Sequence, residues 1–194
     1  MQEIENYLQE GNKVLTGKED TLLLALANFL SSGHTLIEDV PGVGKTTLVK
    51  FFAEIFDLNL SRIQFTNDLL PSDILGTSIY NSEKQNFHFH QGPIFGDIVM
   101  ADELNRAPPK TQSALLQAME EKMVTIDGKT YELNKNFHVI ATQNPHAQIG
   151  TFDLPESQLD RFSLKMEIGY PDESSTLNML KTKTISNSVK ITNK

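Results

Sequence analysis

The sequence contains no cysteine, so the chain can form neither disulfides nor thiolate metal sites. It also lacks a long hydrophobic run: the longest apolar stretch, residues 22–30, is far too short to span a membrane and carries Asn28. The N-terminal sequence MQEIENYLQEG is polar and acidic, which is unlike a signal peptide. We therefore expect a cytoplasmic protein without a membrane span.

Positive charge is scarce, with 17 lysines and arginines against 25 aspartates and glutamates, a net charge of -8. An acidic surface repels phosphate backbones, so nucleic-acid binding is unlikely unless a local basic loop provides it. What the chain does have is 194 residues, of which 39% are hydrophobic. This length and composition predict one ordinary domain with a buried core.

Short apolar segments alternate with segments of helical spacing along the chain. Strands are predicted at residues 34–38, 60–65, 97–101, 137–142 and 163–168, and helices at 3–15, 21–30, 46–56 and 111–121, with Thr21 as a cap. The alternation predicts an α/β fold whose parallel sheet is covered on both faces. Residues 76–92 and 123–137 break it and are predicted to form β-hairpins, the second with Asp127-Gly128 at its tip.

The stretch EDVPGVGKTT, residues 38–47, lies between a predicted strand and a predicted helix. Glycines at 42 and 44 allow a backbone to wrap around a phosphate, and a helix N-terminus attracts one. Lys45 can supply charge to the β- and γ-phosphates, and the Thr46 hydroxyl can ligate Mg²⁺. We expect the phosphates of a nucleotide to be bound by Pro41, Gly42, Val43, Gly44, Lys45, Thr46 and Thr47.

Asp39 departs from the strict phosphate-loop pattern, which has glycine at this position. Aspartate tolerates left-handed backbone conformations better than most residues, so it can replace that glycine. Its carboxylate is expected to turn away from the phosphates and accept N–H groups of the loop. The alternative is a glycine-rich helix start without a ligand, and the flanking strand and helix favour the nucleotide site.

Asp102 and Glu103 end the apolar run DIVMADE. Ligands of open α/β sheets bind beyond the carboxyl ends of the strands, where the chain can turn both carboxylates toward one crevice. Asp102 is expected to hold Mg²⁺, and Glu103 to polarise the attacking water as general base for ATP hydrolysis. The alternative is an acidic, solvated strand end, which becomes less attractive because the glycine loop predicts the other half of the same site.

Several blocks of the sequence resemble the MoxR family of AAA+ ATPases. The resemblance is carried by EDVPGVGKTTL, QFTNDLLPSDILG, GPIFGDIVMADELNRAPPKTQSALLQAMEE, IATQNP and LPESQLDRF, which run through most of residues 35–170. It implies a P-loop NTPase αβα sandwich with a five-stranded parallel sheet, ATP and Mg²⁺ as ligands, and a homo-oligomeric ring, usually a hexamer. The EDVPG form of the loop looks normal for this family.

The resemblance also assigns roles to residues outside the phosphate loop and the acidic pair. Asn144 matches the residue that orients the attacking water or senses the γ-phosphate; by itself it could be a turn residue before Pro145. Arg161 matches the arginine finger that reaches a neighbouring subunit's nucleotide, a task suited to an always charged, bidentate group; by itself it could be paired with Asp160 or Glu156.

Four further polar residues are expected near the acidic pair or the subunit boundary. Asn105 and Arg106 are expected near the subunit boundary, and Gln64 and Thr66 to restrain Glu103, although ordinary strand polar residues are an equal alternative. The hairpins match inserts that project toward a pore or client.

The histidines at 34, 88, 90 and 138 are expected to have structural roles. The HFH segment at 88–90 could bind metal, but no third ligand is nearby and a hairpin strand is favoured. His34 and His138 are expected to be core or strand-end residues.

Family members usually continue into a helical lid, whereas this sequence ends soon after the expected lid linker. The resemblance therefore implies a core at residues 1–170 with inserts at about 76–92 and 123–137, followed by the start of the linker and a polar tail at 171–194. The chain is expected to be a piece of a longer protein or a natural short form, with weak nucleotide binding and slow hydrolysis.

Three functions stay open from the sequence. The first is a MoxR-type ATPase that remodels client proteins or loads them with a metal cofactor, with a von Willebrand factor A-domain partner. The second is a magnesium-chelatase-like or helicase-like motor, disfavoured by the charge of -8. The third is a nucleotide-gated binding module with little hydrolysis of its own.

Overall fold

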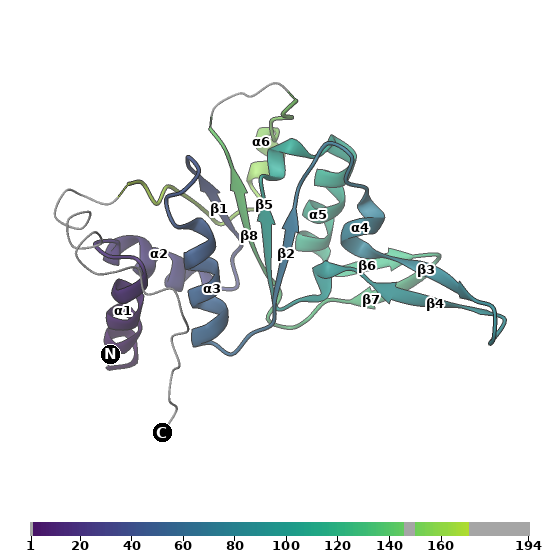
Figure 1. Ribbon diagram of the computed structural model, residues 1–194, viewed down its shortest axis with the longest axis horizontal. Coiled ribbons are helices and arrows are strands. Elements are labelled where there is room, and N and C mark those ends of the chain that lie inside the picture. The colour runs from purple at the N-terminus through teal and green to yellow at the C-terminus, as the bar shows by residue number, and fades with distance from the viewer. Residues whose placement is uncertain (1, 146–149, 171–194) are drawn as a thin grey trace.

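The computed structural model describes residues 2–145 and 150–170 (Figure 1). Five strands form one sheet in the order β2-β5-β8-β1-β9, and every neighbouring pair is parallel. Their bounds are β1 (Thr35–Glu38), β2 (Leu60–Gln64), β5 (Ile98–Asp102), β8 (His138–Gln143) and β9 (Leu164–Met166). The predicted α/β fold with a five-stranded parallel sheet is confirmed.

Helices cover the two faces of this sheet (Figure 1). One side carries α1 (Gln2–Val14), α2 (Glu19–Leu30) and α3 (Lys45–Ile55), and the other carries α4 (Pro71–Leu75) and α5 (Pro109–Glu121). Shorter turns are η1 (Pro93–Phe95), η2 (Leu104–Arg106) and α6 (Glu156–Leu159). The prediction that Thr21 caps the second helix is wrong, because α2 begins at Glu19 after Lys18, which makes no side-chain capping bond.

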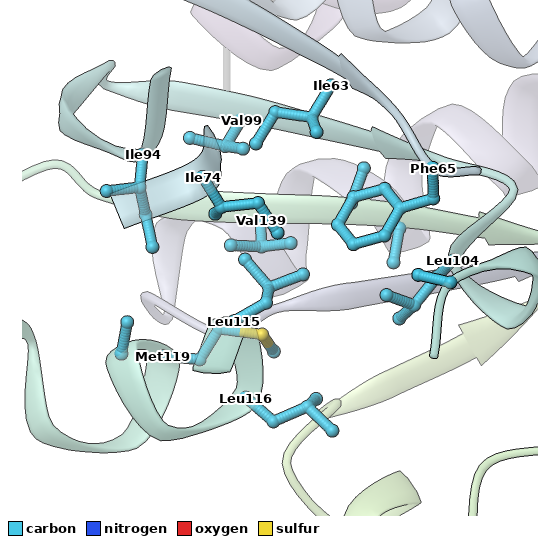
Figure 2. Packing of buried hydrophobic residues seen from close by; sticks show 14 of the residues in the cluster. Ile63, Phe65, Ile74, Ile94, Val99, Leu104, Leu115, Leu116, Met119 and Val139 are labelled. Atoms are coloured by element: carbon cyan, nitrogen blue, oxygen red, sulfur yellow. The ribbon is translucent and has the colours of Figure 1, made fainter. Parts of the chain in front are cut away.

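Alternate residues of each central strand enter different halves of the core. In β5, Val99 and Ala101 pack toward α4 and α5, whereas Ile98 and Met100 pack toward α1, α2 and α3. Figure 2 shows the first half, in which Leu115 of α5 lies among residues from β2, β5 and β8. Both faces of a parallel sheet are buried at its centre, so β5 is apolar and buried at four consecutive positions rather than at every second one.

Two β-hairpins extend from the sandwich, side by side on the α4 and α5 side (Figure 1). They consist of β3 (Gly76–Asn81) with β4 (Asn86–Gln91), and of β6 (Met123–Ile126) with β7 (Lys129–Glu132). The second turns through Asp127 and Gly128, which both have positive φ (51° and 77°), the geometry expected of an Asp-Gly turn. Both hairpin predictions are confirmed.

Aromatic rings join the two hairpins. Phe89 of β4 stacks on Tyr131 of β7 with ring centroids 4.1 Å apart and planes 24° apart. The histidines on either side of Phe89, at 88 and 90, are exposed. Within residues 2–145 and 150–170, no group of three or more histidine, aspartate or glutamate side chains is arranged to hold a metal ion. The same residues include no helix long and apolar enough to cross a membrane.

The amino ends of the strands bury polar side chains. His34 is 6% exposed; its Nδ1 accepts the Val139 N–H at 2.9 Å. His138 is 3% exposed and packs edge-on against Phe29, with centroids 5.1 Å apart. Burial lowers the pKa of His34 to about 4 and that of His138 to about 3, so both rings are neutral at pH 7. The expectation that both are core or strand-end histidines is confirmed.

Candidate nucleotide site

The glycine loop connects β1 to α3, as predicted. Gly42 and Gly44 have φ of 88° and 101°, in the left-handed region that favours glycine. A Cβ atom at Gly44 would lie 2.8 Å from Leu15 Cδ2, so a side chain there would require Leu15, the residue after α1, to shift. Helix α3 then starts at Lys45, with its first N–H groups at the loop.

A pocket of about 340 Å³ opens at the carboxyl ends of the strands. Its lining residues are Pro41, Gly42, Gly44, Lys45, Thr46, Thr47, Asp102, Glu103 and Asn144. The structure thus brings the loop, the acidic pair and Asn144 together at the edge of the sheet where ligands of open α/β folds bind. Val43 is not a lining residue, since its side chain is buried in the core on the α3 side.

Lys45 is the cation of this pocket. Its Nζ donates to the main-chain oxygen of Asp39 at 2.5 Å. Desolvation lowers the pKa of Lys45, while the negative charges of Asp39, Asp102 and Glu103 oppose that shift. The ammonium group of Lys45 can bind an anion, and the nearby carboxylates can bind a cation. The pocket is therefore suited to an anionic ligand that has a cation bound to it.

The predicted left-handed backbone of Asp39 is wrong. Asp39 does not have positive φ, so it does not replace glycine by adopting a left-handed conformation. As expected, its carboxylate accepts a loop N–H: Oδ1 accepts that of Val40 at 2.7 Å. Aspartate suits this position because its carboxylate forms hydrogen bonds to the main chain, and not because it tolerates a left-handed backbone.

Asp102 is engaged from both sides. Its Oδ1 accepts the Thr142 hydroxyl at 2.7 Å, and its Oδ2 accepts Arg62 Nη2, also at 2.7 Å. The Thr142 hydroxyl in turn accepts the Glu103 N–H at 2.9 Å, which links β8 to the acidic pair. Arg62 stands on the edge strand β2 with about half of its side chain exposed, so its ion pair is open to exchange with solvent ions.

Glu103 has a left-handed backbone (φ 57°, ψ 48°), which is uncommon for this residue type and turns the chain at the end of β5. This turn brings the side chains of Asp102 and Glu103 to the same pocket. Glu103 Oε2 accepts Gln64 Nε2 at 2.9 Å and Arg106 Nη1 at 2.8 Å. The Thr66 hydroxyl donates instead to Asp68, so the expectation for Gln64 matches a contact and the one for Thr66 does not.

Asn144 follows β8 and is supported by Asn105. Asn105 Nδ2 donates to the Asn144 main-chain oxygen at 3.3 Å. Asn144 Oδ1 is buried and has no hydrogen-bond partner among the described residues, so it is available to a ligand. The prediction that Asn105 faces a subunit boundary is wrong, because its side chain is 4% exposed and packs within the subunit.

Arg161 lies outside the pocket. Its Nε and Nη2 donate to Glu120 Oε2 of α5 at 2.9 and 2.8 Å. The alternative expectation of a salt bridge named the wrong partners, since the ion pair is with Glu120 rather than with Asp160 or Glu156. Arg161 therefore does not serve the pocket of its own subunit in this structure.

Arg62 and Thr142 were not foreseen as residues of this site. Thr142 could have been found from its place two residues before Asn144 at the end of a predicted strand, since the parallel register sets Ala101 beside Ala141. Arg62 had no sequence signal of its own: strand order makes β2 the neighbour of β5, and the sequence does not state that order.

Comparisons with known proteins agree with this geometry. Residues 34–164 match the profile of the ATPase family associated with various cellular activities (AAA). The chain is 54% identical over 169 residues to the uncharacterized protein YeaC of Bacillus subtilis, covering 87% of this chain and 53% of YeaC. It is 45% identical over 168 residues to chaperone MoxR1 of Mycobacterium tuberculosis, covering 87% of this chain and 45% of MoxR1.

A solved structure has the same fold. The crystal structure of a candidate ATPase from Cytophaga hutchinsonii superposes with a TM-score of 0.82 and 45% identity, covering 96% of this chain and 56% of that one. The chain therefore spans about half the length of the relatives it matches.

Proposed function

Because the chain belongs to the AAA family of ATPases and is of the MoxR type, we propose that it binds ATP with Mg²⁺ in the pocket between β1, β5 and β8 and hydrolyses it. One observation carries the proposal. A phosphate-type loop, two carboxylates and a buried amide oxygen line the same pocket, and this oxygen has no hydrogen-bond partner in the described part of the chain. Each part of this set has a use in phosphoryl transfer.

The residues present fit a hard divalent cation. Asp102 offers carboxylate oxygens and Thr46 a hydroxyl oxygen, the donor types that Mg²⁺ takes when it is also held by phosphates. Such an ion neutralises charge that develops on the phosphate oxygens. Arg62 then has to give up Asp102 Oδ2, which it can do at low cost because an exposed ion pair contributes little.

Glu103 acts as the general base toward water in this proposal. Its bonds to Gln64 and Arg106 occupy Oε2 and hold the carboxylate in place until these partners move. Asn144 offers Oδ1 and its amide N–H groups to the water or to the γ-phosphate. Lys45 exchanges the Asp39 carbonyl for phosphate oxygens.

The wider role of the protein is proposed at the level of the family. The chain acts within a homo-oligomeric ring, a hexamer, in which Arg161 leaves Glu120 and reaches the pocket of a neighbouring subunit. The ring uses ATP to remodel client proteins or to load them with a metal cofactor, together with a von Willebrand factor A-domain partner. The lid linker and tail expected at 171–194 lie outside the described residues.

Lysine at position 45 is the first test. We expect Lys45→Ala to weaken ADP binding by about a hundredfold or more, since charge-assisted bonds to phosphate contribute on the order of 1.5–3 kcal/mol each. Isothermal titration calorimetry measures this, with Lys50→Ala, an exposed lysine of the same helix, as the matched control. Equal affinity for the two variants would contradict the assignment of the pocket.

Glutamate at position 103 is the second test. We expect Glu103→Gln to bind ATP normally and to lose at least about a hundredfold in phosphate release, because general-base catalysis contributes 10² to 10⁴. Glu54→Gln, an exposed change of the same kind on α3, is the control. Hydrolysis at the unmodified rate would show that another group is the base.

A nucleotide-gated binding module is the second candidate. It is favoured by the two bonds that hold Glu103 and by the placement of Arg161 outside the pocket, since both reduce hydrolysis by an isolated chain. Phosphate release measured with and without enforced oligomerisation separates the two functions. Salt-dependent DNA binding, which the charge of -8 disfavours, is the corresponding test for a helicase-like motor.

A further inference from the structure

Asp39 occupies the position at which the strict phosphate-loop pattern has glycine, and it is 8% exposed. Its side chain accepts three main-chain N–H groups. Oδ1 accepts that of Val40 at 2.7 Å, while Oδ2 accepts those of Ile168 at 2.8 Å and Gly169 at 2.6 Å. Both carboxylate oxygens of Asp39 are therefore occupied by main-chain donors.

The residues that Asp39 joins are far apart in the sequence. Asp39 follows β1 at the entrance of the phosphate loop, and Ile168 and Gly169 follow β9 at the sheet edge. The ladder between β1 and β9 ends at the pair Ile37 and Met166. Beyond it, the Asp39 carboxylate takes the N–H groups that no strand neighbour receives, and so continues the connection by a side chain.

The main chain of Asp39 is at the same time bonded to Lys45, which lines the pocket. Its N–H donates to the Gln143 main-chain oxygen at 3.2 Å, next to Asn144. Its carbonyl oxygen accepts Lys45 Nζ. A phosphate that enters the pocket competes with the Asp39 carbonyl oxygen for Lys45, so binding it breaks the bond between Lys45 and Asp39.

We propose that Asp39 is a positioning residue that couples the phosphate loop to the segment at 168–170, where the chain leaves the sheet. The coupling rests on the proposed function in that it requires the pocket to take phosphate. When Lys45 moves from the Asp39 carbonyl to a phosphate, the main chain at 39 shifts, and the carboxylate transmits the shift to the two N–H groups it holds. The aspartate is thus a functional part of the loop, and restoring glycine removes it.

Backbone exchange in the absence of nucleotide tests the tether. The amides of Ile168 and Gly169 are expected to exchange at least tenfold faster in Asp39→Gly and Asp39→Asn than in the unmodified 194-residue chain, whereas the amides of β8 keep their rates. Asp39→Asn is the milder change, and thermal melting of both variants verifies that they fold. Unchanged exchange at 168 and 169 in folded variants would overturn the inference.

Binding of ADP tests the coupling. Saturating ADP is expected to change exchange at Ile168 and Gly169 in the unmodified chain and to leave it unchanged in the Asp39 variants. Asp39→Gly is also expected to bind ADP about tenfold more weakly, the order of magnitude for one lost hydrogen bond to a charged group, although it restores the strict loop pattern.

A matched control lies at the other edge of the sheet. Asp97 Oδ2 accepts the Asn59 N–H at 3.0 Å, so Asp97→Asn removes a comparable carboxylate without touching the pocket. This variant should leave both ADP affinity and exchange at 168 and 169 unaltered.

The two proposals fail in different ways. If ADP binds but produces no change at 168 and 169, the coupling is overturned while the nucleotide site stands. If the unmodified chain shows no binding heat with ADP, the proposed function and the coupling both fail. Amide exchange without nucleotide then still decides whether Asp39 tethers the segment at 168–170.

Discussion

The two ends of the sheet are built differently. At the amino ends, polar side chains are buried in the fold: His34 and His138 are neutral rings in the core, and Asn28 bonds to the start of β1. At the carboxyl ends, the acidic pair is held by side chains that are about half exposed, namely Arg62 and Arg106. The difference teaches that one end stabilises the molecule, while the other is free to exchange partners with a ligand.

Acid should act on the buried histidines of the amino end and give the largest effect. The pKa of His34 is about 4 and that of His138 about 3 in the folded protein, against about 6.5 unfolded. The unfolded chain takes up protons first, so the contribution is intact above pH 6.5 and is lost as pH falls from 6.5 toward 3. We expect the free energy of unfolding to decrease by about 3 kcal/mol or more across this window.

Urea unfolding at several pH values measures this loss. His138→Phe keeps an aromatic ring against Phe29 and should flatten the pH profile, whereas His88→Phe, on the exposed hairpin, should not. An identical slope in the unmodified chain and in His138→Phe would mean that His138 does not contribute to the acid sensitivity.

Asn28→Ala should give the next largest effect. Asn28 Nδ2 lies 3.0 Å from the Gly33 oxygen, 3.1 Å from the His34 oxygen and 2.9 Å from Thr35 Oγ1. Removing the donor leaves buried acceptors unpaired, at a cost on the order of 2–3 kcal/mol. Thermal melting measures the loss, with exposed Asn136→Ala as the control, and ADP affinity should be the same in both. A comparable loss of ADP affinity would remove the distinction between the two ends.

Arg62→Ala should give the smallest effect, and on binding rather than on stability. The variant frees Asp102 Oδ2, so half-saturation by ADP should need up to about fivefold less Mg²⁺, since exposed ion pairs contribute about 0.2–1 kcal/mol. Titration of ADP at several Mg²⁺ concentrations measures the shift, while the melting temperature stays within a degree or two of the unmodified chain. A raised Mg²⁺ requirement would instead make Arg62 part of the cation site.

The parts of the fold that follow a repeating pattern could be predicted from the sequence. Apolar runs located all five strands, and the Asp127-Gly128 turn located one hairpin, because these signals are local. The short helices α4 and α6 were missed because four or five residues give too little periodicity. Proline at 71 and Asp73, whose carboxylate accepts the Leu70 N–H at 2.9 Å, are the start signals that could have revealed α4.

The pocket was predictable to the extent that its residues lie in contiguous motifs. The loop at 41–47 and the acidic pair at 102–103 come from two strand ends, and the sequence supplies both. Pairings across the sheet were not predictable in the same way. Arg62 on Asp102, Glu120 on Arg161 and Asp39 on Ile168 depend on strand order and on the ends of neighbouring elements, which are set by tertiary packing.

The ring stack of Phe89 on Tyr131 has a consequence for redesign. The hairpins that carry these rings come from two separate segments of the chain, yet each ring covers the other, so neither hairpin is an independent module. A graft that replaces residues 76–92 alone would leave Tyr131 with an uncovered face, and one that replaces 123–137 alone would do the same to Phe89. Any exchange of these hairpins between proteins of this architecture therefore has to move both of them as a pair.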